Sequence, residues 1–324
     1  MRDANPALPH AQRGLALITA VLVVAIVATT AATLALGEQV WLRQSQNMAD
    51  RAQAVSLRQG ALNYAAILLA RDLSLNNNNV DHLGELWAQP LPPLPVEGGM
   101  ITFRVSDAQG LFNLNNLVTN GAPSTTDIEM FRRLLESLLL NPELRYALLD
   151  WLDIDNNVSP AGAEDTEYLA LSKPYRAANR LLESVDELRL IRGFDAKTVE
   201  KLRPYVVALP GRTTVNVNTA PELVLAALFT TPPLAALKLL VDSRATQPFT
   251  DAANFASRVP PSNVPLTSLY GVATSYFLVN IDIRYGRLQR RTLALIQRAA
   301  GKPAVILWQQ LPPLQFETDK DEKT

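Results

Sequence analysis

The sequence predicts an α+β protein. A long N-terminal helix, partly embedded in a membrane, packs on an antiparallel sheet into which a large, mostly α-helical domain is inserted. Three observations support this prediction. Leu15–Leu36 is a run of 22 residues without an ionisable side chain. A heptad-like pattern follows it without a proline as far as Leu73. Segments that alternate between apolar and polar residues flank a region with helix-start signals.

The apolar run is long enough to span a membrane as one helix. At about 1.5 Å per residue, Leu15–Leu36 crosses roughly 30 Å of hydrocarbon. The fourteen residues before it carry Arg2 and Arg13, whereas Glu38 and then Arg43 follow it. Because positive charge marks the cytoplasmic flank, we expect a single-pass anchor with the C-terminal bulk of the chain on the opposite side.

Gly14 stands before the apolar run, whereas a secretory signal peptide is cleaved after its apolar region. Arg13–Gly14 followed by the apolar helix resembles the class III leader of type IV prepilins and type II secretion pseudopilins. The resemblance implies that residues 1–14 are a leader, that a prepilin peptidase cuts after Gly14, and that Leu15 is then methylated. A plain signal anchor is the alternative.

Thr19 departs from the usual pilin pattern, which has Glu at the fifth mature position. Among pseudopilins, the absence of that Glu is the pattern of the minor K-type subunit. The Glu is thought to pair with the N-terminal amine of a neighbouring subunit in hydrocarbon, where an unpaired charge is costly. A subunit with Thr19 suits the first position of a filament. In the simpler interpretation, its hydroxyl bonds a carbonyl one turn back in the helix.

Residues 37–75 are predicted to continue the helix beyond the membrane. Apolar residues recur there in steps of four and three, interrupted by two polar positions. A helix of nearly sixty residues would extend about 90 Å. An ordinary signal-anchor stalk would show the same periodicity. The stripe consists of Trp41, Ser45, Met48, Ala52, Val55, Gln59, Leu62, Ala66, Leu69 and Leu73.

The sheet is expected in residues 76–124 and 211–316, with a helical excursion at 219–260. Ile101–Val105 alternates, and after the Asp107–Gly110 turn Phe112–Leu114 is predicted to return as its hairpin partner. Further strands are predicted at Thr214–Val217 and at 277–285. After a turn at Gly286–Arg287, another strand is predicted through Leu293 and Leu295, and the last at 304–308. Residues 317–324 are too charged to pack and are predicted to be disordered.

Residues 125–210 are predicted to form the inserted α-helical domain. Three helix starts mark it: a Thr126–Glu129 capping box, Asn141–Pro142, and Ser184 with Glu187. The region has 15 acidic and 11 basic residues, a net charge of −4, whereas the whole chain carries −1.

The segment Asp107–Leu117, read DAQGLFNLNNL, connects these elements to one family. It resembles the D-x-x-G-x-F-N-L-N-N-L block of the K-type minor pseudopilins of type II secretion (general secretion pathway protein K). Similar blocks extend the resemblance over nearly the whole chain; they read DWLDID…GAED, PYRAAN, SVDELRLIRGF and VNVNTA.

This resemblance implies a pilin-like fold in the bacterial inner membrane, with the C-terminal domain in the periplasm. It implies a minor pseudopilin at the tip of the pseudopilus that initiates assembly and helps export folded proteins. The implied partners are the minor pseudopilins I and J, the prepilin peptidase, inner-membrane lipid, and secreted cargo or the outer-membrane secretin.

The stretch Asp150–Asp165 has the composition of a calcium loop. Asp153, Asp155 and Asn157 fall at positions 1, 3 and 5, and Glu164 falls at position 12, as in an EF-hand. Position 6 is Val158 rather than glycine, so we expect a calcium loop of a different shape. A solvated acidic turn is the alternative. K-type pseudopilins bind calcium in this region, so the resemblance favours Ca²⁺, with Asp150 and Asp165 as added ligands.

Leu190–Leu202, read LIRGFDAKTVEKL, looks like a helix-hairpin-helix. In nucleic-acid-binding versions the hairpin offers backbone N–H groups to phosphate. Here Asp195 replaces the second glycine and would repel phosphate, and the surrounding charge is negative. We therefore expect a structural role and no nucleic acid partner. A membrane-anchored helix-hairpin-helix protein of DNA binding and uptake is the alternative function.

The sequence contains no pattern of catalytic residues. There is no cysteine, and the histidines are His10 and His82. No G-x-S-x-G, P-loop or H-E-x-x-H motif occurs. A membrane-tethered hydrolase would need a clustered site of this kind, so we predict that the protein is not an enzyme.

Overall fold

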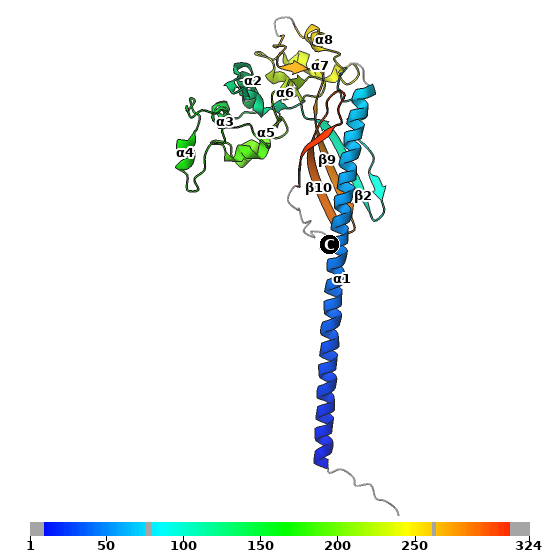
Figure 1. The fold of residues 1–324 in the computed structure, drawn as a ribbon. Helices are drawn as coiled ribbons and strands as arrows, with labels where there is room; N and C mark the ends of the chain where they lie inside the picture. The colour runs from blue at the N-terminus through cyan, green and yellow to red at the C-terminus, as the bar shows by residue number, and fades with distance from the viewer. Residues whose placement is uncertain (1–9, 76–78, 261–263, 312–324) are drawn as a thin grey trace, which may run out of the picture.

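A computed structural model describes residues 10–75, 79–260 and 264–311. Figure 1 shows a long helix, α1, whose upper part lies along a sheet and whose lower part extends away from the globular region. A second, mostly helical body projects to one side at the end of the molecule farthest from the start of α1 (Figure 1). The predicted α+β class is confirmed. The tail at 317–324, predicted to be disordered, and residues 1–9 of the predicted leader lie outside the described residues.

Helix α1 runs from His10 to Leu75 without a break, over 66 residues. It contains an apolar window with a mean hydropathy of 2.4, none of which is buried within the protein. Among the described residues this is the one helix long and apolar enough to cross a membrane. The predicted continuous helix is therefore confirmed, and it fits a single-pass membrane anchor.

The upper part of α1 packs on the sheet through small and aliphatic residues. The buried side chains are those of Ala54, Ala61, Leu62, Ala65 and Leu69. The alanines allow the helix backbone to approach the sheet closely, and burial of the leucines contributes about 25 cal/mol per Å². Trp41, Met48 and Val55 of the predicted stripe are exposed.

The main sheet has five antiparallel strands in the order β1-β2-β9-β10-β11. Its buried face contacts α1, and alternation along β9 follows the predicted pattern, with Phe277, Val279 and Ile281 buried and Asn280 exposed. The strands are β1 (Leu94–Val96), β2 (Gly99–Asp107), β9 (Tyr276–Tyr285), β10 (Leu288–Gln297) and β11 (Val305–Gln310).

The helical insertion is larger than the predicted 125–210. The chain leaves the sheet after β2 and returns at β9, so the insertion covers residues 108–275. One continuous core joins residues from Phe112 to Tyr270. The predicted boundaries are wrong because the strand expected near Val215 does not join the main sheet. That strand, β7 (Val215–Asn216), pairs with β8 (Tyr270–Gly271) inside the insertion.

The predicted hairpin between Ile101–Val105 and Phe112–Leu114 is also wrong. Strand β2 pairs with β9, and β3 (Phe112–Asn113) pairs in parallel with β6 (Val206–Val207). The physical reason lies in the turn. The Asp107 carboxylate accepts a hydrogen bond from the Gln109 backbone N–H at 2.7 Å, which starts the chain on its path into the insertion.

The remaining elements of the insertion are short helices, hairpin strands and 3-10 turns. They are η1 (Leu114–Leu117), β4 (Val118–Thr119), β5 (Ala122–Pro123), α2 (Thr125–Ser137), α3 (Leu144–Leu152), α4 (Asp165–Leu169), η2 (Val185–Leu190), α5 (Ala196–Leu202), α6 (Glu222–Ala227), α7 (Leu234–Ser243) and α8 (Ala252–Ser257).

The FNLNNL block is structural. Its three asparagines are buried, and their amides hold distant backbone segments together. Asn113 accepts from the Leu209 N–H and donates to the Gly211 carbonyl. Asn115 both accepts from and donates to the backbone of Leu182. The amide N–H and C=O groups of these side chains are both paired. They provide the hydrogen bonds that the loop backbone would otherwise lack, because the loops do not pair with each other as strands do.

A second buried polar network joins the insertion to the sheet. The Asp107 carboxylate accepts hydrogen bonds from Asn216 Nδ2 at 2.8 Å and from Thr219 Oγ1 at 2.6 Å. Asn216 Nδ2 also donates to the Asp81 carbonyl. Beside it, Arg298 at the end of β10 binds the carboxylates of Asp72 and Asp81. These contacts fix the insertion relative to α1 and the sheet.

Glu85, in the segment that follows α1, should make stability depend on pH. Burial raises its pKa to about 7, although hydrogen bonds from His82 N–H and Trp87 Nε1 oppose the shift. The folded state therefore holds a proton that the unfolded state releases near pH 4.5, and stability falls as pH rises from about 4.5 to 7. We expect Glu85→Gln to increase the free energy of unfolding by about 1 to 2 kcal/mol at pH 8 and to change little at pH 4.5. Thermal melts at the two pH values test this, and an equal effect at both would contradict it.

Candidate functional site

The predicted calcium loop lies between two helices of the insertion. Asp150 is in the last turn of α3, and Asp153 is the residue that ends that helix. Glu164 precedes α4, which begins at Asp165. The acidic residues therefore come from the end of one helix, the loop and the start of the next helix, and the loop folds back between the two.

Three of the predicted ligands meet in this loop. Asp153, Asp155 and Glu164 each offer a carboxylate oxygen, and these oxygens all lie within 4.8 Å of one another. Asp153 is 7% exposed and Glu164 is 2% exposed, whereas Asp155 is exposed to solvent. Like charges at this separation repel one another, so the geometry is unfavourable unless protons or a cation neutralise it.

The buried oxygens of this cluster have no protein partner. Asp153 Oδ1 and both carboxylate oxygens of Glu164 accept no hydrogen bond. Burial, followed by the nearby carboxylates, raises the pKa of Asp153 to about 6 and that of Glu164 to about 7. Because buried polar atoms in proteins are almost always satisfied, these orphaned oxygens fit a hard cation, which binds six to eight oxygen ligands.

The other three predicted ligands have different partners. The Asp150 carboxylate is buried and accepts a hydrogen bond from the Ser159 backbone N–H at 3.0 Å. Asp165 accepts from the Ala177 N–H and pairs with Arg176. Asn157 is exposed, and its backbone N–H donates to Asp155 Oδ1 at 2.7 Å. Asp150 and Asp165 lie outside the group of carboxylates whose oxygens are within 4.8 Å of one another, although the charges of both help to raise the pKa of Glu164.

The loop differs in shape from an EF-hand, as expected from the absence of glycine at its sixth position. Val158 occupies the sixth position, and the left-handed turn falls later, at Ala161, whose φ is +62°. The glycine that the loop requires is Gly162, because a Cβ there would collide with the Asp150 carboxylate. The sequence contains this glycine, but EF-hand spacing gives it no role.

Asn179 is a candidate ligand that sequence reasoning missed. Its Oδ1 atom is buried without a partner, and its Nδ2 donates to the Asp155 carbonyl at 3.5 Å. Its φ of +47° is a conformation that asparagine tolerates better than most residues. The signal in the sequence was the PYRAAN block, which ends at Asn179.

The predicted processing and assembly residues all lie on α1. Gly14 is within this helix, which begins at His10. Leu15 is 69% exposed, and Thr19 is also exposed. These residues lie far along the helix from the globular part, on the portion that extends alone in Figure 1.

The helix-hairpin-helix segment consists of η2, a turn at Gly193 and α5. The Asp195 carboxylate accepts a hydrogen bond from the Thr198 backbone N–H at 2.7 Å, so a donor at the start of α5 is already used. Gly193 has a φ of +85°, and a Cβ there would strike Leu144. The glycine serves packing against α3, which accords with the predicted structural role.

Comparison with known proteins identifies the family. Two family models, both described as Type II secretion system (T2SS), protein K, match this chain. The first matches residues 110–211 and the second matches residues 215–275. The chain is 37% identical over 298 residues to the type II secretion system protein K of Pseudomonas aeruginosa, covering 89% of each chain. It is 33% identical to the Klebsiella pneumoniae protein, covering 89% of this chain and 93% of the relative.

A solved structure is also similar. A chain of the crystal structure of the GspK-GspI-GspJ complex from the enterotoxigenic Escherichia coli Type 2 Secretion System superposes with a TM-score of 0.73 at 29% identity. The match covers 83% of this chain and 99% of that chain. The resemblance inferred from the sequence motifs is confirmed: this chain belongs to the type II secretion system protein K family of minor pseudopilins.

Proposed function

We propose that this protein is located at the tip of the type II secretion pseudopilus, where it initiates assembly and helps export folded proteins across the outer membrane. The observation that carries the proposal is the insertion of residues 108–275, which lies at the end of the molecule farthest from the membrane-spanning part of α1 (Figure 1). Such bulk would obstruct a subunit stacked above it. Thr19, in place of the pilin Glu, suits the same position.

The proposed cellular location follows from the membrane-spanning part of α1. The span lies in the bacterial inner membrane, with the insertion and the sheet in the periplasm. The proposed partners are minor pseudopilins of the I and J types, because the related chain is found in a GspK-GspI-GspJ complex. Secreted cargo and the outer-membrane secretin are further proposed contacts. The family is one of structural pseudopilins, and we propose no catalytic activity.

The exposed part of the α1 stripe provides a test of assembly. Trp41 is 66% exposed and Met48 is 64% exposed, and both lie between the membrane span and the packed part of α1. Replacing both with Glu should weaken binding to I- and J-type partners about tenfold or more, because apolar burial is lost. The assay is size-exclusion chromatography with light scattering in detergent. The control is Leu139→Glu, on an 88% exposed leucine of the insertion.

The native chain alone should not form filaments in this assay. Extended polymers of this chain by itself would contradict the tip position. Partner binding that the Trp41 and Met48 substitutions leave unchanged would contradict the assigned surface.

Processing provides an independent test. On co-expression with a prepilin peptidase, the mature chain should begin at Leu15. Gly14→Leu should block cleavage, whereas Ala16→Leu, just beyond the cut, should not. Intact-mass spectrometry measures both. A native chain that retains residues 1–14 would show that the segment is a plain signal anchor.

We also propose that the Asp153–Glu164 loop binds Ca²⁺. The support is the set of orphaned buried oxygens on Asp153 and Glu164, together with the carboxylate of Asp155 and the buried Oδ1 of Asn179. Bound calcium would remove the repulsion between these carboxylates and fix the loop between α3 and α4. Its role is structural, since no group in the loop is placed for chemistry on a substrate.

A further inference from the structure

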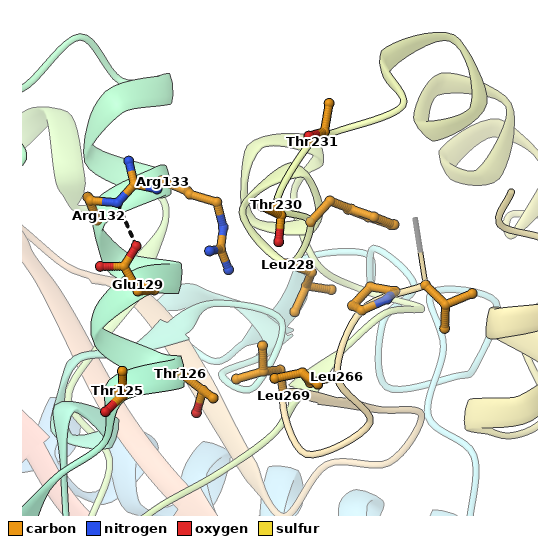
Figure 2. Close-up of a pocket in the computed structure, with 13 residues that line it drawn as sticks. Thr125, Thr126, Glu129, Arg132, Arg133, Leu228, Thr230, Thr231, Leu266 and Leu269 are labelled. Atoms are coloured by element: carbon orange, nitrogen blue, oxygen red, sulfur yellow. Dashed lines mark hydrogen bonds and ion pairs between the residues drawn. The ribbon is translucent and has the colours of Figure 1, made fainter. Parts of the chain in front are cut away.

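A cavity of about 550 Å³ lies in the insertion, away from the acidic loop. Its walls come from α2, from residues 228–231 after α6, and from residues 264–269 (Figure 2). Neither the proposed calcium site nor the assembly surface of α1 uses this cavity.

The cavity has an apolar floor and a polar rim. Leu228, Phe229 and Leu269 are each less than 5% exposed and form the floor. Thr125, Thr126, Thr230 and Thr231 bring four hydroxyl groups to the edge (Figure 2). A pocket of this kind takes an apolar group whose polar end remains near the hydroxyls.

The two arginines of the cavity differ in their partners. Arg132 is bound by Glu129 at 2.7 Å and also by Glu136, so its charge is matched within α2. The Arg133 side chain makes one hydrogen bond, from Nε to the Ala227 carbonyl at 2.7 Å, and within the described chain it has no carboxylate in salt-bridge contact.

The bond to Ala227 orients the Arg133 guanidinium. Because Nε is held by the end of α6, the terminal nitrogens extend from α2 into the space between the walls, as Figure 2 shows. Burial, followed by the neighbouring Arg132, lowers the pKa of Arg133, whereas the charges of Glu129 and Glu136 oppose the shift. The terminal edge of a guanidinium binds a carboxylate through two parallel hydrogen bonds.

We propose that this cavity binds a polypeptide segment in which a carboxylate stands beside a bulky apolar side chain. The carboxylate pairs with the Arg133 terminal nitrogens, and the apolar side chain rests on Leu228, Phe229 and Leu269. The carboxylate comes either from a free C terminus or from an internal Asp or Glu. The inference depends on neither the tip position nor the calcium site.

The test uses the full chain in detergent and three fluorescein-labelled peptides, with empty micelles as the blank. The first ends in Ala-Phe with a free carboxylate, the second is its C-terminal amide, and the third carries Asp-Phe-amide. At least one carboxylate peptide should bind about tenfold or more tightly than the amide, measured by fluorescence anisotropy. The preference between the first and third peptides assigns the source of the carboxylate.

Two variants locate the binding. Arg133→Gln should weaken binding of the carboxylate peptide about tenfold or more, with little change for the amide. Leu266→Trp should fill the cavity and abolish binding; Leu266 is 57% exposed, so the change should leave the melting temperature near the native value. Arg180→Gln, an exposed arginine outside the cavity that pairs with Glu183, is the matched control.

Several results would overturn the proposal. These are equal binding of the carboxylate and amide peptides, failure of all three peptides to bind at millimolar concentration, and native affinity in both Arg133→Gln and Leu266→Trp. Competition by hexanoate as effective as that by the unlabelled peptide would overturn the assignment to a polypeptide.

Discussion

Millimolar calcium should raise the melting temperature of the metal-free protein, and Glu164→Gln should remove most of that rise. A ligand that binds the folded state alone stabilises it by about 2.7 kcal/mol at one hundred times its Kd, which corresponds to roughly 5 to 10 °C here. Magnesium should do less, because it requires a small octahedral site and gives up water reluctantly. Differential scanning fluorimetry with EDTA, Ca²⁺ and Mg²⁺ makes the comparison.

Without metal, Glu164→Gln should not lower the stability of the protein. At pH 8 the Glu164 carboxylate is ionised, although burial raises its pKa to about 7, so the charge destabilises the metal-free fold. Metal-free Glu164→Gln should therefore be at least as stable as the native protein. The control is Glu183→Gln, whose side chain is 80% exposed. A native melting temperature that is equal in calcium and in EDTA would identify the loop as an acidic turn.

Arg298→Ala should destabilise the protein by about 3 to 5 kcal/mol, because it leaves buried carboxylates without their cation. Arg298 is 2% exposed and binds Asp72 Oδ2 at 2.8 Å, the Asp81 carboxylate, and the Thr274 carbonyl at 3.0 Å. Its guanidinium also lies 4.6 Å from the centre of the Phe277 ring. Urea denaturation measures the loss of stability.

Two comparisons separate this effect from a general loss of charge. Arg291→Ala removes a side chain that is 59% exposed and pairs with Asp282 at 3.1 Å, and it should cost less than about 1 kcal/mol. Arg298→Met combined with Asp72→Asn and Asp81→Asn should recover part of the loss, since the two carboxylates that paired with Arg298 are then replaced by neutral amides. If Arg298→Ala and Arg291→Ala cost the same, the buried bridge does not hold the junction.

Local sequence patterns predicted the helices and strands better than they predicted which strands pair with each other. The apolar run, the proline-free stripe and the alternation along Phe277–Ile283 each depend on neighbouring residues, and the structure confirms the resulting helix and strand. The pairing of β2 with β9 depends on residues 170 to 186 positions apart, which no local pattern encodes. For this reason the hairpin and the limits of the insertion were predicted wrongly.

The candidate calcium site shows a similar limit. Spacing identified Asp153, Asp155 and Glu164, which the structure brings together. Spacing alone could not show that Asp150 and Asp165 accept hydrogen bonds from the backbone N–H groups of Ser159 and Ala177. The role of Asn179 depends on a loop that returns to Asp155, so it required the tertiary structure.

The position of the insertion has a consequence for the order of folding. The two strands that it separates are adjacent, and the Ala108 N–H donates to the Tyr276 carbonyl at 2.9 Å where the chain leaves and re-enters. Pairing β2 with β9 while the residues between them are a flexible coil would require closing a very long loop, whose entropic cost slows the pairing. If residues 108–275 collapse first around their own core, that loop becomes a compact body with neighbouring ends. We expect the nascent chain to fold from this middle segment outward, with the sheet and its contact to α1 completed only after β9–β11 have been synthesised.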